Sequence, residues 1–237
     1  MIQFFKQISK LRSNIYAGIQ DQSNKQHISF LRQLQKDSKE NKSLEIPLKD
    51  LKTVVFDLET TGFYPEKGDH ILSIGAVKMT GDKIEDDYFY SLVKSELPLS
   101  KEISLLTNIQ ENQLKTAPEA KDVFIQFLKY TNTRILVAHH SQHERSFMQK
   151  MSRDTMRIGF QQRIIDTSFL AFLQNTTTKS QPLDDICNQL GIKIENRHNA
   201  LGDAQMTARI WSLYMNKAIL LGFGSLLEIY EYLAKLK

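Results

Sequence analysis

Two acidic residues, Asp57 and Glu59, lie at the end of the apolar run 54–56, which is typical of a buried strand. Side chains alternate along a strand, so residues two positions apart lie on the same face. The two carboxylates are therefore held side by side next to apolar packing, where an isolated negative charge is costly. This pattern indicates that something positive offsets their charge.

Two later stretches also place an acidic residue beside apolar ones. The stretch HHSQHERSFM covers residues 139–148, and in a helix its Glu144 lies on the apolar side, close to Phe147 and Met148. The stretch HNALGDAQMTARIW covers residues 198–211, where Asp203 lies beside an apolar stripe and His198 precedes it by five residues. The acids of all three stretches are candidates for one shared site.

Carboxylates that converge on one cavity repel one another, which raises their pKa values and destabilises the fold. Divalent cations remove that cost, and hard ions such as Mg²⁺ prefer carboxylate and water oxygens. Two such ions about 4 Å apart stabilise both the attacking and the leaving oxygen in phosphodiester hydrolysis. A nearby neutral histidine can take the proton from the attacking water. The three stretches therefore predict metal-dependent phosphodiester hydrolysis.

The chain contains three motifs in a fixed order: FDLETTG, VAHHSQHERSFM and HNALGDAQMTA. Over residues 51–217 they resemble the motifs of the DEDDh 3′→5′ exonucleases, a family that includes the proofreading epsilon subunit of bacterial DNA polymerase III. The resemblance implies a ribonuclease-H-like fold, two divalent metal ions (Mg²⁺ or Mn²⁺) and release of 5′-mononucleotides from 3′ ends. It assigns metal binding to Asp57, Glu59 and Asp203, and the role of general base to His198.

The second motif departs from the family pattern, which usually has His-Asn and then an aromatic residue followed by aspartate. This chain has His139-His140 and then His143-Glu144, so Glu144 takes the place of the aspartate. Glutamate still offers two oxygens but reaches about one methylene further, so we expect metal binding with altered geometry or a preference for Mn²⁺. The asparagine is replaced by His140, which changes one expected substrate contact.

Glu144 also has a structural interpretation. Residues 141–144, Ser-Gln-His-Glu, fit a capping box, in which the glutamate bonds back to the start of its helix. The presence of the other two motifs favours the metal-ligand interpretation. The three histidines of this stretch are also compatible with zinc, but no cysteine or H-E-x-x-H pattern supports that metal.

Residues just past the acids of the first motif, and two histidines of the second motif, are candidates for substrate binding. Backbone and hydroxyl groups just past the acids are well placed for a terminal nucleotide, although the same residues could form an ordinary turn. An aromatic ring there could stack on a base or cover the core. The predicted substrate-binding residues are Thr60, Thr61, Gly62, Phe63, His139 and His140. Asp166, after a short strand, is expected to cap the next helix.

The helices and strands that position these residues are predicted to form an α/β domain with a mixed sheet flanked by helices. Strands are expected at 53–58, 70–79, 88–93, 134–138 and 163–165. The turn-rich residues 80–83 between the second and third strands suggest an antiparallel pairing. Helices are expected from 100, over 118–130, from 141, and over 182–190 and 199–217.

The composition is that of a soluble globular protein, with 41% apolar and 24% charged residues. No apolar run approaches the roughly 18 residues that cross a bilayer, and the N-terminus lacks the pattern of a signal peptide. A single cysteine, Cys187, excludes an internal disulfide framework. These features predict a cytoplasmic protein with one main domain, over residues 51–237.

Residues 1–50 differ from the rest in charge. They hold nine Lys/Arg and five Asp/Glu, whereas the remaining residues hold 22 of each. Apolar residues at helical spacing predict a helical N-terminal extension and linker that docks on the main domain or on a partner. Its basic excess could help to hold a polyanion, but the interspersed acids favour a solvated helical face.

The functional prediction is a metal-dependent 3′→5′ exonuclease that acts on single-stranded or frayed 3′ ends. DNA is favoured as substrate, and RNA or short oligonucleotides remain possible because the motifs read a phosphodiester and a sugar. A polymerase or another replication or repair protein is a possible partner. From a different class, the chain could be a 3′-end binding module with weakened catalysis, an alternative that Glu144 and His140 favour.

Overall fold

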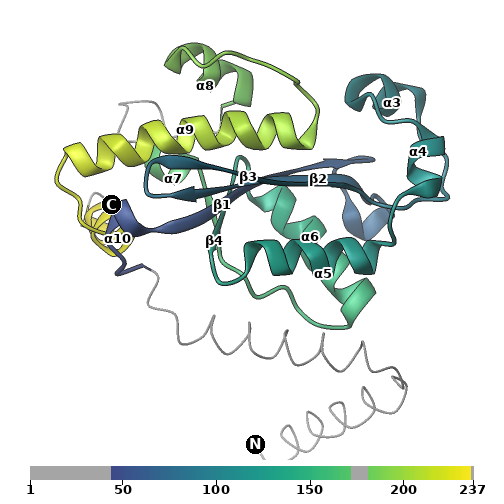
Figure 1. The fold of residues 1–237 in the computed structure, drawn as a ribbon, viewed down its shortest axis with the longest axis horizontal. Helices are drawn as coiled ribbons and strands as arrows, with labels where there is room; N and C mark the ends of the chain where they lie inside the picture. Colours follow the sequence, from purple (N-terminus) through teal and green to yellow (C-terminus); the bar gives the residue numbers. More distant parts are fainter. Residues whose placement is uncertain (1–43, 172–180, 236–237) are drawn as a thin grey trace, which may run out of the picture. The chain divides into compact units, whose positions relative to one another are not determined.

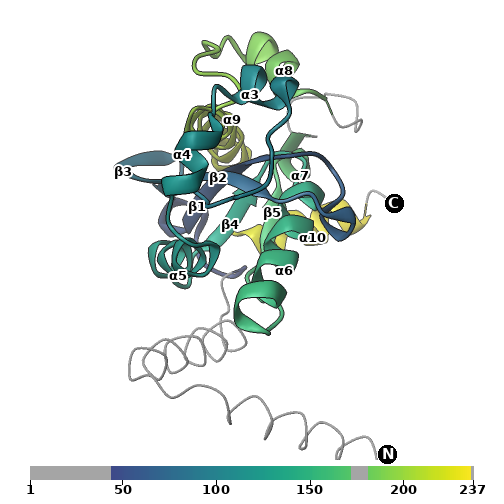
Figure 2. The same ribbon diagram turned by 90° about the vertical axis from the view of Figure 1, so that its right-hand side faces the viewer.

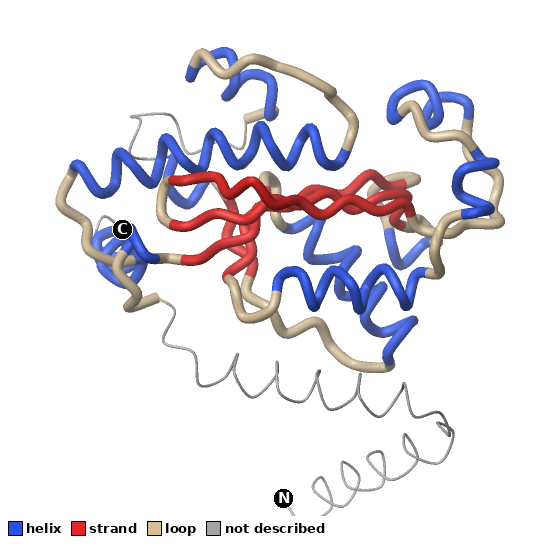
Figure 3. The backbone as a smooth tube through the Cα atoms, viewed as in Figure 1, coloured by secondary structure: helices blue, strands red, loops and turns tan. Residues whose placement is uncertain are grey.

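The structure is a computed structural model, in which residues 44–171 and 181–235 are described here. These residues belong to one compact unit that spans Asn41–Lys237. The predicted helical extension lies outside the described residues, apart from its last few positions. Figure 3 shows the unit as a central sheet with helices around it.

The sheet has five strands in the order β3-β2-β1-β4-β5. Their bounds are β1 Lys52–Thr60, β2 Ile71–Thr80, β3 Lys83–Leu92, β4 Ile135–Ala138 and β5 Ile164–Asp166. Strand β2 is antiparallel to both of its neighbours, β1 and β3, whereas β4 is parallel to β1 and β5 is parallel to β4. The predicted mixed sheet is confirmed, including the antiparallel pairing across the turn at residues 81 and 82.

The two central strands are buried on both faces. In β1 the apolar residues from Val54 to Phe56 are fully buried, and all four residues of β4 are buried. Such continuous apolar runs are expected where helices cover both sides of a sheet. Residues 53–55 of β1 pair with both β2 and β4, and the pairing with β2 continues past the acids at its end.

Helices form a layer on each face of the sheet. The long helix α9 (Ala200–Leu220) lies along one face against β1 and β2, with α8 (Leu183–Leu190) beyond it (Figure 1). Helices α5 (Ala120–Thr131) and α6 (Gln142–Met156) lie on the opposite side (Figure 2). The fold is thus a three-layer α/β arrangement, as the sequence predicted.

The alternation of β1 side chains decides which layer each contacts. Val55 belongs to the core shared with α9, where Trp211 and Tyr214 are buried. Phe56 packs on the other side, with its ring 5.4 Å from that of Phe127 on α5. By the same alternation, Asp57 and Glu59 share the face of Val55, which is the α9 face.

The remaining elements are short. They are the 3₁₀ helices η1 (Leu48–Asp50) and η2 (Pro65–Lys67) and the helices α3 (Lys101–Thr107), α4 (Glu111–Thr116), α7 (Ser168–Ala171) and α10 (Leu226–Lys235). Helices α4 and α10 were not expected from the sequence, whereas a helix after Asp166, where α7 lies, was indicated by the expected capping role of that residue. In the described part of the chain, no helix combines the length and apolar character needed to cross a membrane.

Residues just before β1 are part of the compact unit. Leu48 is buried in the main core, and its N–H donates to the Gly224 carbonyl at 2.9 Å. The N–H of Leu227 in α10 donates to the Leu44 carbonyl at 2.9 Å. Residues 44–50, which the sequence interpretation assigned to the extension, thus pack against the C-terminal segment.

Candidate metal and active site

Strand β1 presents its two acids opposite small residues of β2. Asp57 pairs with Gly75 and Glu59 pairs with Ser73 in the antiparallel register. A Cβ on Gly75 would lie 2.2 Å from the backbone carbon of Ala200, the first residue of α9. Because glycine has no side chain there, the start of α9 can approach the sheet closely. That approach brings Asp203 over the acids of β1.

The start of α9 is fixed by its own cap. Asn199 has extended backbone geometry, and its side chain accepts from the N–H groups of Leu201 and Gly202 at 3.2 and 3.1 Å. Asparagine is among the preferred residues at this position because its side-chain oxygen satisfies otherwise free N–H groups. Asp203 therefore follows in the first turn, where the helix dipole favours a negative charge.

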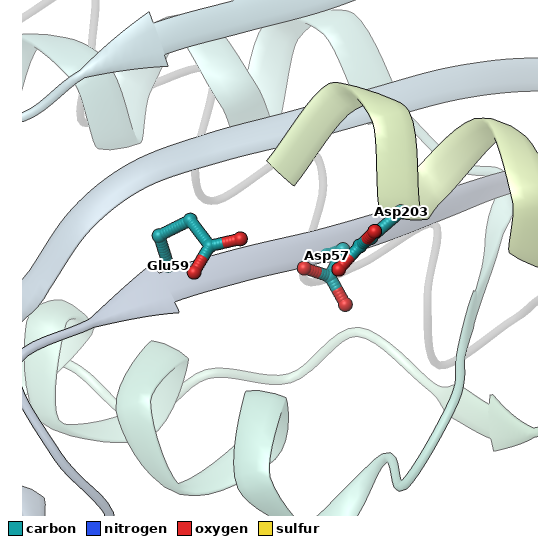
Figure 4. A group of neighbouring side chains, drawn as sticks. All are labelled: Asp57, Glu59 and Asp203. Atoms are coloured by element: carbon teal, nitrogen blue, oxygen red, sulfur yellow. The ribbon is translucent and has the colours of Figure 1, made fainter. Parts of the chain in front are cut away.

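Three predicted metal ligands meet at this point. Asp57, Glu59 and Asp203 each offer a carboxylate oxygen, and these oxygens all lie within 4.8 Å of one another. Figure 4 shows the three carboxyl groups gathered between β1 and the first turn of α9. Among the described residues, this is the one group of acidic, histidine or cysteine side chains close enough together to hold a metal ion.

The electrostatics of the group are those of crowded, buried acids. Burial raises the pKa of Asp57 well above its ordinary range, and the neighbouring carboxylates raise it further. Burial, with the charge of Asp203, raises the pKa of Glu59 to about 7. Burial also raises the pKa of Asp203 to about 6, although Arg197 acts in the opposite direction. Without a cation the site resists carrying its full negative charge.

Glu144 approaches the same group from α6. Its side chain is buried, and burial raises its pKa to about 8. Among the charged neighbours of Asp57, Glu144 raises its pKa most. It does not belong to the three carboxylates within 4.8 Å of one another. The structure therefore places Glu144 near Asp57 but outside the group of three carboxylates.

The capping-box interpretation of Glu144 does not match the structure. Ser141 is the N-cap of α6, but its side chain makes no capping hydrogen bond. The Ser141 N–H instead donates to the carboxylate of Asp166 at 2.6 Å, and the same carboxylate accepts from the Ser168 N–H at 2.9 Å. Asp166 thus binds the beginnings of both α6 and α7, which agrees with its expected capping role. Glu144 is left free to face Asp57.

The residues present fit a divalent metal site. Two buried carboxylate oxygens, Glu144 Oε2 and Asp203 Oδ1, have no hydrogen-bond partner among the described residues. Buried polar atoms normally have a partner, so these two oxygens call for a ligand. Oxygen-only donors that carry negative charge suit Mg²⁺ or Mn²⁺ better than zinc. His139, one of the histidines considered for zinc, has both ring nitrogens within 2.8 Å of protein oxygens, those of Thr167 and Gln181.

His198 lies immediately before the cap of α9. It is partly buried and has a positive φ of 57°, which is uncommon for a residue other than glycine. Its backbone N–H donates to Asp203. Burial lowers the pKa of His198, and the positive charge of Arg197 lowers it further. The imidazole is therefore neutral at physiological pH, as a base must be.

The loop after β1 is held by side-chain hydrogen bonds. Thr61 Oγ1 donates to Asp69 at 3.2 Å and accepts from the His70 N–H at 3.0 Å, and the Tyr64 N–H donates to Asp69 at 2.8 Å. A Cβ on Gly62 would lie 2.5 Å from the Asp69 carboxylate, so only glycine lets the loop lie this close. Asp69 thus fixes the conformation of the predicted substrate loop.

The loop joins the second motif through Thr60 and Phe63. Thr60 Oγ1 lies 3.4 Å from His143 Nε2, and the Phe63 ring centroid lies 5.8 Å from that of His143. The Phe63 side chain is 78% exposed, so it does not cover the core. His140 is exposed and stacks on His139, with ring centroids 4.1 Å apart. Of the predicted substrate-binding residues, Phe63 and His140 are thus exposed, whereas His139 is buried.

Several residues near the site were not singled out from the sequence. Arg197 is bonded to Asp203, and Asp184 on α8 is bonded to Arg197. Tyr90 on β3 lies near Glu59 and Asn199, and burial raises its pKa. Arg197 could have been noticed because it directly precedes His198, but nothing in the spacing of Tyr90 or Asp184 indicates their place at the site.

Comparison with known proteins supports the family resemblance that the three motifs indicate. The family model described as exonuclease, of the RNase T type, matches residues 54–211, more than half of the chain. A DNA polymerase III subunit epsilon-like protein of Rhodobacter capsulatus is 35% identical over 169 residues, which cover 69% of this chain and 24% of that protein. A PolC-type DNA polymerase III of Caldanaerobacter subterraneus is 33% identical over 176 residues, which cover 74% of this chain and 12% of that protein. The chain thus spans less than a quarter of these curated relatives.

Solved structures share the fold. The nuclease domain of 3′hExo, described as a DEDDh family member bound to rAMP, aligns with a TM-score of 0.60 at 20% identity, covering 72% of this chain and 92% of that one. Exonuclease I of E. coli in complex with a dT13 oligonucleotide aligns with a TM-score of 0.61 at 11% identity, covering 73% of this chain and 42% of that one. The chain is therefore a member of the exonuclease family, and its domain has the ribonuclease-H-like fold of the DEDDh 3′-exonucleases.

Proposed function

We propose that the chain is a metal-dependent 3′→5′ exonuclease that releases 5′-mononucleotides from nucleic-acid 3′ ends. The observation that carries this proposal is the meeting of Asp57, Glu59 and Asp203, whose carboxylate oxygens lie within 4.8 Å of one another. The three acids come from the two most specific motifs, and they lie within the region, residues 54–211, that matches the exonuclease family. Membership in that family and the geometry of the acids support the same reaction.

The acids would hold two divalent cations. Asp57, Glu59 and Asp203 are the proposed ligands of the group, and Glu144 adds a fourth carboxylate from the α6 side. Both Glu144 Oε2 and Asp203 Oδ1 have the free lone pairs that this role requires. When bound, the two cations supply positive charge that stabilises the phosphate and the attacking and leaving oxygens.

His198 is the proposed general base. Its lowered pKa keeps the ring neutral, so that a ring nitrogen can accept a proton from the attacking water. Because the nucleic acid is cleaved at its 3′ end, the leaving group is the 3′ oxygen of the preceding nucleotide. The phosphate stays on the released mononucleotide. The position of His198 at the cap of α9, bonded by its backbone to Asp203, keeps the base beside the acids.

The loop from Thr60 to Phe63 is the proposed binding site of the terminal nucleotide. Its conformation is set by Asp69, and its exposed Phe63 ring is available to stack on a base. His140, exposed at the start of the second motif, is proposed to take the substrate contact that asparagine makes in the family. Stacking and backbone contacts of this kind accept any base, which suits an enzyme that removes successive nucleotides.

We favour single-stranded or frayed DNA as substrate because the relatives are named as parts of DNA polymerase III. A polymerase or another replication or repair protein is accordingly the proposed partner. RNA is the second candidate, because one structure of the same fold is described as a nuclease domain bound to rAMP. Matched DNA and RNA oligonucleotides, which differ chiefly in the 2′-hydroxyl, distinguish the two by their relative rates.

The decisive experiment is digestion of end-labelled oligonucleotides with Mg²⁺, Mn²⁺ or EDTA. A 5′ label should give a ladder that shortens from the 3′ end, with 5′-mononucleotides as the product. The variants Asp57→Asn and His198→Ala should lose about a hundredfold or more in turnover, whereas Asp86→Asn, at an exposed acid of β3, should keep it. Digestion that continues in EDTA or in Asp57→Asn would refute the mechanism.

A binding module with weakened catalysis is the second candidate. The replacement of the usual aspartate by Glu144 favours it, because a side chain one methylene longer changes the geometry of the fourth carboxylate. This candidate predicts that the chain binds labelled 3′ ends in the presence of metal but releases no mononucleotide, and that Glu144→Asp restores turnover. Turnover by the unaltered chain excludes it.

A further inference from the structure

Arg197 bridges two acids at the edge of the metal site. Its Nε donates to the Asp184 carboxylate at 2.5 Å, and its Nη1 donates to Asp203 Oδ2. Asp184 lies in the first turn of α8, and Asp203 lies in the first turn of α9. A planar guanidinium can engage two carboxylates at once through its separate N–H groups, which a lysine ammonium does less well.

Arg197 is the positive charge that compensates the acids of the site. Its charge lowers the pKa of Asp57, Glu59 and Asp203, all of which burial raises. Its side chain is partly buried, so its attraction for these acids is only partly screened by water. In the absence of a cation, Arg197 therefore offsets part of the negative charge of the acids.

Asp203 faces two different partners through its two oxygens. Oδ2 accepts from Arg197, while Oδ1 is buried and has no hydrogen-bond partner among the described residues. A metal ion that takes Asp203 as a ligand withdraws negative charge from the whole carboxylate. It also places a second positive charge close to the guanidinium, so the bond to Arg197 is weakened when the metal enters.

We propose that Arg197 is a resident counter-ion that competes with divalent cations for Asp203 and thereby sets the metal affinity of the site. The bond to Asp184 keeps the guanidinium in place when it gives up Asp203, so the competition is reversible. The inference rests on the proposed function, since it concerns the same metal site. A site of which only a fraction is free to bind has an apparent affinity reduced by that fraction.

A purely structural role for Arg197 makes a different prediction. A clamp between α8 and α9 would stabilise the protein equally with and without metal, and its loss would leave metal affinity unchanged. Competition predicts the opposite pattern, in which the metal-free protein loses stability and the metal binds more tightly. Metal affinity therefore separates the two roles without any measurement of activity.

The test is calorimetric titration of the full chain with Mn²⁺ after removal of metal, together with thermal unfolding with and without Mn²⁺. The variant Arg197→Gln should bind Mn²⁺ about threefold or more tightly than the unaltered chain. Without metal, the unfolding midpoint of the variant should be lower than that of the unaltered chain. The rise of the midpoint on adding Mn²⁺ should be larger in the variant. The control Arg209→Gln removes the same charge from an exposed position on α9, where Arg209 lies 3.8 Å from Glu195, and should keep the affinity of the unaltered chain.

A second variant covers the case in which Arg197→Gln does not fold. Arg197→Lys retains the positive charge but does not hold Asp184 and Asp203 together, so it should also bind Mn²⁺ more tightly. Equal affinity in the unaltered chain and in each folded Arg197 variant would overturn the inference and leave the proposed function standing. Absence of Mn²⁺ binding in all of them, including the Arg209→Gln control, would instead remove the proposed metal site itself.

Discussion

Glu144 combines two properties that conflict in a metal-free protein. It is buried with one oxygen unpartnered, and it lies beside the buried carboxyl of Asp57. A structural role as part of a capping box would have paired it with Ser141, but the Ser141 side chain makes no capping bond at the start of α6 and the Ser141 N–H donates to Asp166 instead. A buried acid that costs stability and has one carboxylate oxygen without a partner is best explained by a functional role.

The variant Glu144→Gln should separate stability from activity. It removes a buried carboxyl whose pKa is raised to about 8, so at pH 8 we expect the metal-free protein to gain on the order of 2 kcal/mol in free energy of unfolding. Turnover should fall by roughly a hundredfold because a metal-facing oxygen is lost. Urea unfolding in EDTA and single-turnover digestion measure the two effects. A variant that loses both stability and activity would indicate a structural role.

The raised pKa values also predict how stability depends on pH. In the unfolded chain these carboxyls titrate near pH 4, whereas in the fold the pKa is about 7 for Glu59 and about 6 for Asp203. Between these values the folded protein binds more protons than the unfolded chain, so the free energy of unfolding falls as the pH rises. For these two groups we expect a decrease on the order of 3 kcal/mol from pH 5 to pH 8 in EDTA.

Metal should remove this pH dependence. Mn²⁺ binds the ionised carboxylates and stabilises the folded state that holds them. Urea unfolding at several pH values, with EDTA and with Mn²⁺, measures both curves. Metal-free stability that rises from pH 5 to pH 8 would contradict the electrostatic description of the site.

At the scale of elements, the approach of α9 to β2 is what assembles the acids. The contact at Gly75 allows no side chain, since a Cβ there would lie 2.2 Å from the Ala200 backbone. Ala76 and Val77 follow in the same strand and are buried, so β2 has little freedom to move away. The position of α9 on the sheet therefore depends on a single residue without a side chain.

The variant Gly75→Ala should displace the start of α9. We expect a loss of about 1–3 kcal/mol in free energy of unfolding and a fall in turnover, because Asp203 moves away from Asp57. Gly159→Ala is a matched control, since the added Cβ would come no closer than 3.1 Å to the end of a flexible Gln161 side chain. Thermal unfolding and digestion rates of both variants test the expectation, which fails if Gly75→Ala keeps full turnover.

The loop after β1 makes a separate prediction. Asp69 accepts from Thr61 Oγ1 and the Tyr64 N–H, and it packs against Gly62. Asp69→Ala should loosen the loop and raise KM by roughly three- to tenfold with a smaller effect on kcat, because the metal ligands stay in place. Asp86→Ala, at an exposed acid of β3, is the control. A fall in kcat at unchanged KM would show that the loop serves the chemistry rather than substrate binding.

The sequence predicted the elements with strong periodicity better than the short ones. Four strands and the helices α5, α6, α8 and α9 were expected close to their observed bounds, because each has a clear apolar pattern. The exception is β3, which begins at Lys83, five residues before the predicted start, because most of its first half is exposed. Helix α4 has six residues, which is too short for a period to be recognised, and the four-residue α7 was indicated only by the expected capping role of Asp166. Helix α10 lies beyond the last motif, and its role depends on packing against residues 44–50, which no local pattern reveals.

The site residues that belong to sequence motifs could be predicted. The residues that join the site only because the fold brings them close could not. Asp57, Glu59 and Asp203 were predicted to meet, and the structure brings them together. The bond of Arg197 to Asp203 depends on the turn that precedes α9, where Asn196 and His198 both have positive φ. Backbone conformations of this kind are rarely evident from sequence in residues other than glycine.

At the scale of the whole molecule, the compact unit extends further toward the N-terminus than the motifs do. Leu48 is buried in the main core, and the backbone of residues 44–48 bonds to the segment around α10. The matched family region begins only at residue 54. The boundary of the stable domain is therefore set by this contact with the C-terminal segment and not by the first motif.

Two truncated chains test this boundary. A chain of residues 41–237 should keep the turnover and the unfolding midpoint of the unaltered protein, because it retains the whole compact unit. A chain of residues 51–237 loses the buried Leu48 and should be about 2–4 kcal/mol less stable, with its acids still in place. Urea unfolding and digestion rates of both chains measure this difference. Equal stability of the two chains would show that residues 41–50 contribute nothing to the fold.

The acids of this site are supplied by the first strand and by the last long helix of the domain, β1 and α9. A ribosome therefore synthesises nearly the entire domain before Asp203 exists to join Asp57. An emerging polypeptide with β1 already paired holds only an incomplete set of ligands. In the proposed mechanism, cleavage of nucleic acid needs Asp203, so a chain that ends before α9 is expected to bind no metal pair and to cleave nothing.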